Sequence, residues 1–224
     1  MANFGTHISV AAGSGCVLAL GGWHLGLWTP WQAWPLMLLT TLGGIMPDID
    51  SDHSHSVRLV FGLLAFISTA SAAWLLQARL DFGYWLMACA ATYLMVRYLL
   101  APLFKRFSVH RGVWHSLLAA LFVAWTGSAL SHGVLGQPAW LAWTHGTALL
   151  LGCLVHLTLD EVYSVDLEGM RLKRSFGTAL KLFDYDRPWR AVVLLLLMAA
   201  MLPWLPSWQS LAAVGEQWLA LWPQ

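Results

Sequence analysis

The chain carries little charge for its length. Only 10% of its 224 residues are Asp, Glu, Lys or Arg, whereas 58% are apolar. Soluble domains have roughly 25% charged and 45–50% apolar residues. So few ionisable side chains cannot cover the apolar surface of a folded chain this short in water. The composition therefore excludes an ordinary soluble protein and a disordered one, and a mean hydropathy of +0.63 indicates a bilayer protein.

Several other features are scarce or missing. The three cysteines lie in apolar segments without CxxC spacing, which excludes a disulfide framework and a thiolate metal site. A net charge of +1 gives no electrostatic attraction to nucleic acid, so none is expected as a partner. The signals HExxH, GxSxG and GxxxxGK(S/T) do not occur. The first residues lack the basic region of a secretory signal, so we expect the first apolar segment to remain in the membrane.

Apolar runs of roughly the 20 residues that cross a hydrocarbon core recur along the sequence. They predict an all-α polytopic transmembrane helical bundle, a single integral membrane domain over residues 1–224. The seven predicted spans are residues 8–28, 31–46, 59–76, 82–104, 113–135, 140–159 and 191–205. The second and last are short and imply tilt or bilayer thinning. Residues 211–222 are too short to span and predict a helix lying at the interface.

Basic residues are unevenly distributed between the two sides of these spans. Seven spans place the N-terminus and the loops after the second, fourth and sixth spans on one side, which holds ten of the twelve basic residues. Because Lys and Arg favour the cytoplasmic side, we expect this face to be cytoplasmic. Its longest loop, residues 161–190, is polar and predicts a short amphipathic helix over residues 175–183, capped by Ser175. This segment would anchor the protein by binding anionic lipid headgroups, or it would act as a lid whose basic residues hold a phosphate near the metal.

Side chains that bind metals gather on the same predicted face, from four segments distant in the sequence. Asp48 and Asp50 follow the second span behind a proline, where a turn is expected. His156 and Asp160 are four residues apart and share one helical face. Imidazole together with carboxylate suits Zn²⁺, Mn²⁺ or Fe²⁺. We predict one or two divalent ions, with Zn²⁺ favoured, bound by His7, Asp48, Asp50, His110, His115, His156 and Asp160.

The remaining histidines have a simpler interpretation. His24, His132 and His145 lie in apolar segments and are interpreted as packed or interfacial residues. His53 and His55 follow the aspartate segment and would at most support the site.

Three further residues are predicted to act on the substrate. Arg111 adjoins His110, and its planar guanidinium matches the oxygens of a phosphate. A carboxylate outside the ligand set, Asp52 or Glu161, would serve as general base or acid.

Four segments together resemble a known family. They are Thr6-His7, Pro47-Asp-Ile-Asp50, His110-Arg-Gly-Val-Trp-His115-Ser116 and His156-Leu-Thr-Leu-Asp160. In this order they resemble the YdjM-like family of bacterial inner-membrane, metal-dependent hydrolases. The resemblance implies a bound divalent metal, hydrolysis, a location in the bacterial inner membrane and a polar site formed by the seven predicted ligands.

The sequence thus predicts a membrane-embedded metal-dependent hydrolase. A metal-bound hydroxide would attack a phosphoester of a phospholipid or lipid-linked substrate at the cytoplasmic face. Two alternatives remain open. A divalent-cation transporter would place its site near the bilayer midplane, yet no Asp or Glu lies deep in a predicted span. A structural membrane protein stabilised by a metal would have no open coordination position.

Overall fold

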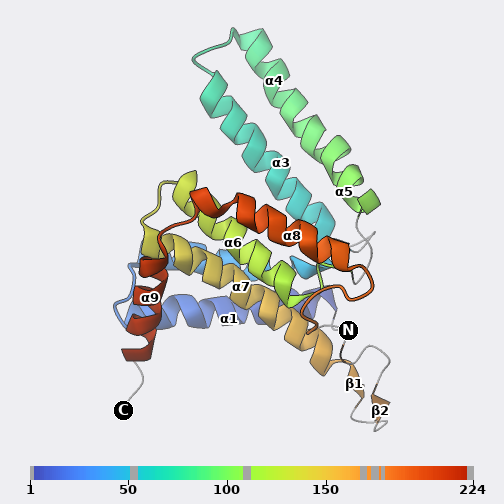
Figure 1. Cartoon of the computed structure of the whole chain (residues 1–224). Helices are drawn as coiled ribbons and strands as arrows, with labels where there is room; N and C mark the ends of the chain where they lie inside the picture. Colours follow the sequence, from blue (N-terminus) through green and yellow to red (C-terminus); the bar gives the residue numbers. More distant parts are fainter. Residues whose placement is uncertain are drawn as a thin grey trace. The chain divides into compact units, whose positions relative to one another are not determined.

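The computed structural model describes residues 3–50, 55–107, 112–166, 171–172, 177 and 180–220. Regular structure in these residues is helical apart from one antiparallel pair of two-residue strands, β1 (Val165–Asp166) and β2 (Arg171–Leu172) (Figure 1). The chain forms two compact units. One comprises residues 1–47 and 113–224, and the other comprises residues 48–112.

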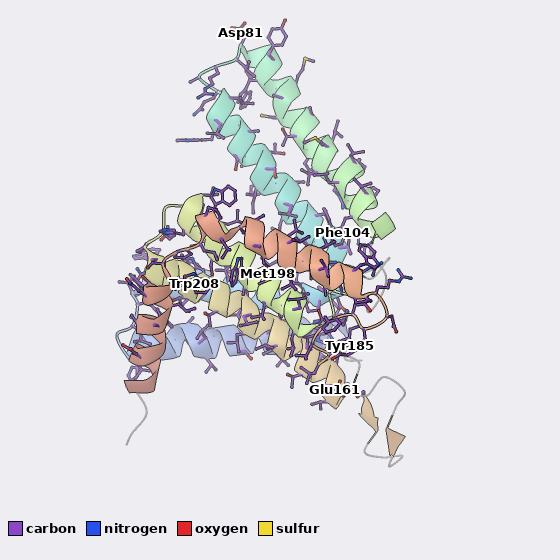
Figure 2. All side chains as sticks on the ribbon, in the orientation of Figure 1. Asp81, Phe104, Glu161, Tyr185, Met198 and Trp208 are labelled. Carbon is purple, nitrogen blue, oxygen red and sulfur yellow. The ribbon has the colours of Figure 1, made fainter. Side chains whose placement is uncertain are left out.

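The smaller unit is a helical hairpin. α3 (His55–Leu76) runs against a continuous helical stretch of α4 (Phe82–Leu94), the π-helical η2 (Met95–Leu100) and α5 (Ala101–Phe107). Figure 2 shows Asp81 at the turn between the two arms and Phe104 on α5. The arms are joined by a hydrogen bond of 2.9 Å from the Trp85 indole to the Ala73 carbonyl. Nearer the open end, the rings of Phe61 and Phe104 lie 5.3 Å apart.

The larger unit contains the remaining helices. In chain order they are α1 (Phe4–His24), α2 (Pro30–Gly43), α6 (Leu117–Gly133), α7 (Ala139–Val162), α8 (Pro188–Ala200) and α9 (Trp208–Ala220). The described residues also form two short 3-10 helices: η1 (Pro47–Asp50), in which the boundary between the units falls, and η3 (Leu202–Trp204).

α7 is the central helix of this unit. It contacts α1, α2, α6 and α9, and 67% of its most apolar window is buried, against 22% for α1. A helix that is apolar on all sides belongs in the middle of a bundle. Buried residues therefore extend along most of α7, from Leu141 to Asp160.

Glycines let α2 approach α7 closely. A Cβ at Gly152 would lie 2.0 Å from the Thr40 carbonyl oxygen and 2.6 Å from the Gly44 amide nitrogen. A Cβ at Gly43 would lie 2.2 Å from the Leu149 carbonyl oxygen. Small residues at such crossings are typical of helices packed in membranes. The contact brings the end of α2 against the C-terminal half of α7.

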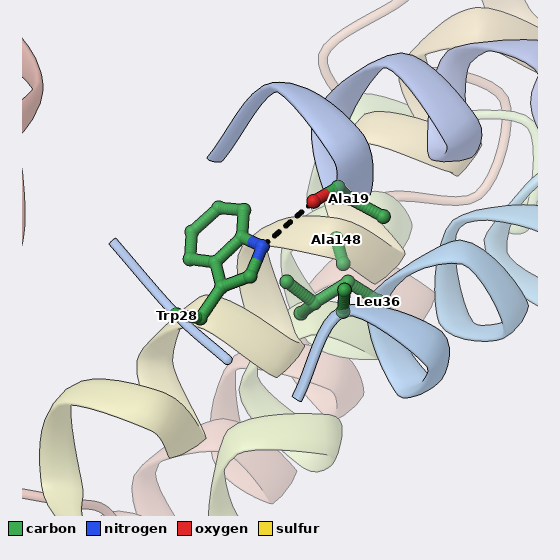
Figure 3. Close-up of a cluster of buried hydrophobic side chains, with 5 residues drawn as sticks. Ala19, Trp28, Leu36 and Ala148 are labelled. Atoms are coloured by element: carbon green, nitrogen blue, oxygen red, sulfur yellow. Dashed lines mark hydrogen bonds between the residues drawn. The ribbon is translucent and has the colours of Figure 1, made fainter. Parts of the chain in front are cut away.

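Trp28 packs in a buried apolar cluster with residues of α1, α2 and α7. Figure 3 shows its indole beside Ala19, Leu36 and Ala148, with a hydrogen bond of 2.8 Å to the Ala19 carbonyl. The buried ring packs directly over Gly22, where a side chain would overlap it. A buried indole N–H needs such a partner, so this contact fixes the α1–α2 turn.

The segment before α8 caps α6. The first two amides of that helix, at Leu117 and Leu118, donate to the carbonyls of Lys181 and Leu182 at 2.9 and 3.0 Å. Helix N-termini leave such N–H groups without intrahelical partners. The segment is itself held to α8 by a buried ion pair, in which Arg190 Nη1 lies 3.6 Å from Asp184 Oδ2.

The predicted helix positions agree with these elements. Each of the seven predicted spans overlaps a helix, and residues 211–222 overlap α9, but seven crossings of the membrane remain a prediction. By length and composition, four helical stretches can cross a membrane, namely Phe4–His24, Ser56–Leu76, Phe82–Phe104 and Ala139–Val162. α6 and α8 are shorter apolar helices.

Two local predictions differ from the structure. α1 begins at Phe4 rather than residue 8, because the Asn3 side chain accepts a hydrogen bond from the Thr6 amide at 2.8 Å and caps the helix earlier. His7 therefore lies inside the helix. In the predicted amphipathic helix at 175–183, the described residues are non-helical: Gly177 lies in a turn with φ of 79° and residues 180–183 form bends and coil. Ser175 lies outside the described residues.

Candidate metal centre

Asp160 is the hub of a buried polar cluster in the larger unit. Its Oδ1 lies 3.2 Å from His7 Nε2, and its Oδ2 lies 3.8 Å from His115 Nε2 and 3.9 Å from His156 Nε2. Each of these four residues is at most 1% exposed. The cluster joins the first turns of α1, the residue before the α6 cap and the last turns of α7. Three segments far apart in sequence thus meet at one carboxylate.

α1 supplies His7. Because the helix begins at Phe4, His7 lies in its first two turns and projects toward α7. The ring stacks on His156 with a centroid distance of 3.7 Å and an interplanar angle of 11°. This stacking and the contact with Asp160 hold the imidazole from two sides. Among the described residues, the buried Nδ1 of His7 has no hydrogen-bond partner.

α7 supplies His156 and Asp160, which the sequence correctly placed on one helical face. His156 Nδ1 lies 2.7 Å from the carbonyl oxygen of Gly44. A carbonyl can only accept a hydrogen bond, so Nδ1 carries the proton in this contact. The lone pair of the neutral ring is then on Nε2, which faces Asp160. Metal-binding histidines are oriented by contacts of this kind.

His115 precedes the N-cap of α6. Ser116 has extended backbone angles, φ of −150° and ψ of 157°, and its hydroxyl accepts a hydrogen bond of 3.2 Å from the Ala119 amide. The chain therefore turns just after His115 and directs its ring toward α7. The ring packs edge-on against His156, with a centroid distance of 5.6 Å and an interplanar angle of 70°. The helix thus begins at Leu117, four residues after the start of the predicted span at residue 113.

The donor set fits a divalent cation. One atom each from His7, His156 and Asp160 can be chosen so that all lie within 4.8 Å of one another. At Zn–N and Zn–O distances of about 2.0–2.1 Å, tetrahedral ligand atoms are roughly 3.3 Å apart. The distance of 3.2 Å between His7 and Asp160 is close to this value, and the distances of 3.8 and 3.9 Å from His115 and His156 are longer by about half an ångström. Buried carboxylates are costly unless they are paired or coordinate a metal, so this cluster has the chemistry of a metal-binding group.

Two of the other predicted ligands lie in η1, and the third lies outside the described residues. Asp48 lies half-buried in η1, which confirms the predicted turn, and belongs to the smaller unit. Asp50 ends the same 3-10 helix. His110, like the predicted phosphate clamp Arg111 and the predicted general base Asp52, lies outside the described residues. Their roles stay predictions.

Glu161, the other predicted general acid or base, has a structural contact. Figure 2 shows it at the end of α7, with Tyr185 on the segment before α8. Its Oε1 accepts a hydrogen bond of 2.5 Å from the Gly177 amide. The residue is next to Asp160 in sequence but about 100° away around the helix. It ties the polar loop to α7.

Of the three histidines interpreted as packed or interfacial, two have structural contacts. His145 is buried in α7, and its Nδ1 lies 2.7 Å from the Ser131 hydroxyl on α6. His132 Nδ1 lies 2.9 Å from the Gln137 carbonyl, which closes the turn after α6. His24 is exposed at the end of α1.

Sequence reasoning missed the carbonyl that orients His156. The signal was the pair Gly43-Gly44 at the end of one predicted span and Gly152 one turn before His156 in another. Small residues at both places predict a close helix contact, and such a contact exposes a backbone carbonyl to a neighbouring side chain. The buried pair Asp184 and Arg190 was also missed, because opposite charges six residues apart around a proline are common in solvated loops.

Comparison with family models, with curated proteins and with solved structures returns no match.

Proposed function

We propose that this protein is a membrane-embedded, metal-dependent hydrolase of the YdjM-like type, which acts on a phosphoester of a lipid or lipid-linked substrate. The observation that carries the proposal is the convergence of three buried imidazoles on Asp160, with donor atoms 3.2–3.9 Å from its oxygens. Ionisable side chains are rarely buried among membrane helices without a functional reason.

Three of the four side chains are assigned to the metal. Catalytic zinc sites use three protein ligands and keep one position open, and His7, His156 and Asp160 provide such a set. Zn²⁺ is favoured by imidazole with carboxylate, and Mn²⁺ or Fe²⁺ would also fit. When bound, the ion would polarise the phosphoester and activate water near neutral pH.

The residues around the ion have distinct tasks. Asp160 offsets the charge of the cation in a dry site, and the Gly44 carbonyl fixes the tautomer of His156. His115 lies just before the N-cap of α6 and contacts Asp160. We assign it the transfer of a proton to or from the substrate. The sequence also favours Asp48, Asp50 and His110 as ligands, Arg111 as phosphate clamp, and Asp52 or Glu161 as acid or base.

The level of the site in the bilayer supports a lipid substrate. At 1.5 Å per residue, α1 and α7 are about 32 and 36 Å long, enough to cross a hydrocarbon core of roughly 30 Å. His7 is the fourth residue of α1, and Asp160 is two residues from the end of α7. The cluster therefore lies within about one turn of two helix ends, where phosphoesters of lipids are found. The excess of basic residues favours the cytoplasmic face of the inner membrane, with seven spans in all.

A metal-stabilised structural protein is the second candidate, and one observation favours it. All four residues of the cluster are at most 1% exposed, and structural zinc sites are closed by four protein ligands. In that case His115 would be the fourth ligand. The two candidates therefore differ in what His115 does.

Elemental analysis of the purified chain, with its His156→Ala variant, tests metal binding directly. We expect a stoichiometric divalent metal in the wild type and its loss in His156→Ala. His24→Ala removes an exposed histidine and should keep the metal. Retention of the metal by His156→Ala would refute the site.

Substrate turnover is tested separately. Vesicles of mixed phospholipids should release a phosphorylated or dephosphorylated headgroup with the wild type, and a chelator should stop the release. Metal bound without turnover of any lipid tested would favour the structural candidate. Metal flux into proteoliposomes without hydrolysis would favour a transporter instead.

A further inference from the structure

An apolar cavity of about 440 Å³ opens between α6, α8 and the segment that precedes α8. Its walls include Leu117 and Leu121 from α6, Leu182 from the segment, and Ala191 and Leu195 from α8. All of its lining residues are Leu, Phe, Pro, Ala or Val. Leu121, Leu182 and Leu195 remain more than 40% exposed, so the cavity opens outward.

The cavity begins beside the candidate metal centre. Leu117 follows His115 by two residues, and its amide donates to the Lys181 carbonyl at 2.9 Å. The hydrogen bond from Leu118 to Leu182 joins the two walls at the same end. These bonds tie the mouth of the cavity to the chain that positions His115.

Exposed aromatic side chains indicate where the Pro188 end of the cavity lies relative to the membrane surface. Tyr185 and Trp189 are 59% and 61% exposed, and the guanidinium of Arg190 lies 5.6 Å from the Trp189 ring centroid. Exposed Tyr and Trp at the start of an apolar helix are typical of the membrane–water interface. From Pro188 to Leu195 the cavity follows α8 for about 10 Å. That depth is within the roughly 15 Å of hydrocarbon in one leaflet.

We propose that this cavity binds one acyl chain of the lipid whose headgroup is presented to the metal centre. The cavity volume favours an acyl chain over a helix of another protein. Two turns of helix with side chains fill a cylinder of roughly 800 Å³, which is more than the cavity of about 440 Å³ holds. Binding of the acyl chain follows from the cavity alone, whereas its being part of the substrate rests on the proposed function. The cavity would then select lipids over soluble phosphoesters.

A second apolar groove provides an internal control. It follows α1 from Val10 to Leu25, has a volume of about 760 Å³ and is lined by Gly and Ser together with Val and Leu. Its length of roughly 22 Å extends beyond one leaflet. Ordinary bilayer lipids should contact it without preference.

The test uses the full chain in phosphatidylcholine vesicles with a small fraction of phosphatidic acid that carries a diazirine on one acyl chain. After irradiation, labelled peptides are located by mass spectrometry. We expect preferential labelling of residues 117–121 and 182–195 over the α1 groove, and competition by unlabelled phosphatidic acid. Equal labelling of the two regions, without competition, would overturn the proposal.

Two variants fill the cavity from opposite walls. Leu121→Trp and Ala191→Phe should each lower the labelling ratio of cavity to α1 groove about tenfold, the effect of losing the burial of about two methylenes. Leu196→Phe, at an exposed position of α8 outside the cavity, should leave the ratio unchanged. Ala191 is buried, so if its variant does not fold, Leu121→Trp decides. An unchanged ratio in the folded blocking variants would contradict the proposal.

Two further results separate this proposal from the hydrolase itself. Chelation should stop hydrolysis and leave the labelling unchanged, because no described metal ligand lines the cavity. Specific labelling of the cavity, with no hydrolysis by any preparation, would support the acyl-chain site and contradict the proposed hydrolase activity. A variant with the photocrosslinker benzoylphenylalanine at position 121 tests for a second copy of the protein in the cavity. Cross-links between two copies, together with exclusion of the lipid probe, would assign the cavity to the second copy and overturn the proposal.

Discussion

The carbonyl oxygen of Gly44 accepts a hydrogen bond of 2.7 Å from Nδ1 of His156, although the two residues are 112 positions apart. The bond exists because α2 and α7 touch through glycines just beside it, at Gly43 and Gly152. Helix packing and the orientation of one imidazole are therefore the same structural feature. A change that separates the two backbones should alter the metal centre without touching a ligand.

Gly152→Ala tests this coupling. The new Cβ would lie 2.0 Å from the Thr40 carbonyl oxygen, so α2 and α7 must separate. We expect a loss of about 1–3 kcal/mol of stability from overpacking and a loss of about 10–100-fold in metal affinity from the displaced Gly44 carbonyl. Thermal unfolding in detergent and metal titration of the stripped protein measure the two effects. Gly13→Ala, whose Cβ would meet no atom within 4 Å, is the matched control.

His115→Ala separates a catalytic from a structural metal. If His7, His156 and Asp160 hold the ion, the variant should retain stoichiometric metal while lipid hydrolysis falls by about 10²-fold or more, as expected for a general acid or base. Elemental analysis and the vesicle assay are done on the same preparation. Loss of the metal from His115→Ala would make this residue the fourth ligand and support the structural candidate.

Much of this architecture could be predicted from the sequence. Apolar runs located every long helix, because a span needs roughly 20 apolar residues, and the i, i+4 spacing placed His156 and Asp160 on one face. The start of α1 was missed because the Asn3 cap precedes the apolar run. The Gly44 carbonyl could not be predicted, because a backbone acceptor has no residue type, and its partner depends on how α2 packs on α7.

The buried pair Asp184 and Arg190 should stabilise the loop that lines the acyl-chain cavity. Their side chains are 6% and 10% exposed, and removing one partner of a buried ion pair costs about 3–5 kcal/mol because the other charge is left unpaired. We expect Asp184→Ala and Arg190→Ala each to lower the thermal midpoint. The double variant should lose less than the sum. Additive losses would show that the two side chains do not interact. Asp186→Ala, at a neighbouring exposed carboxylate, is the control.

His145 distinguishes burial from metal binding. It lies on α7 as His156 does, but its partner is the Ser131 hydroxyl, at 2.7 Å, and its position is 15 residues from Asp160, or about 22 Å along the helix. His145→Ala leaves a buried hydroxyl without this partner, which costs about 1–3 kcal/mol, so the thermal midpoint should fall. Metal content and the midpoint shift on adding metal to the stripped protein should both match the wild type. His7→Ala should show the reverse pattern, with no metal bound and no shift on metal addition. Loss of the metal from His145→Ala would contradict this assignment. It would show that metal binding depends on a buried histidine that does not contact Asp160.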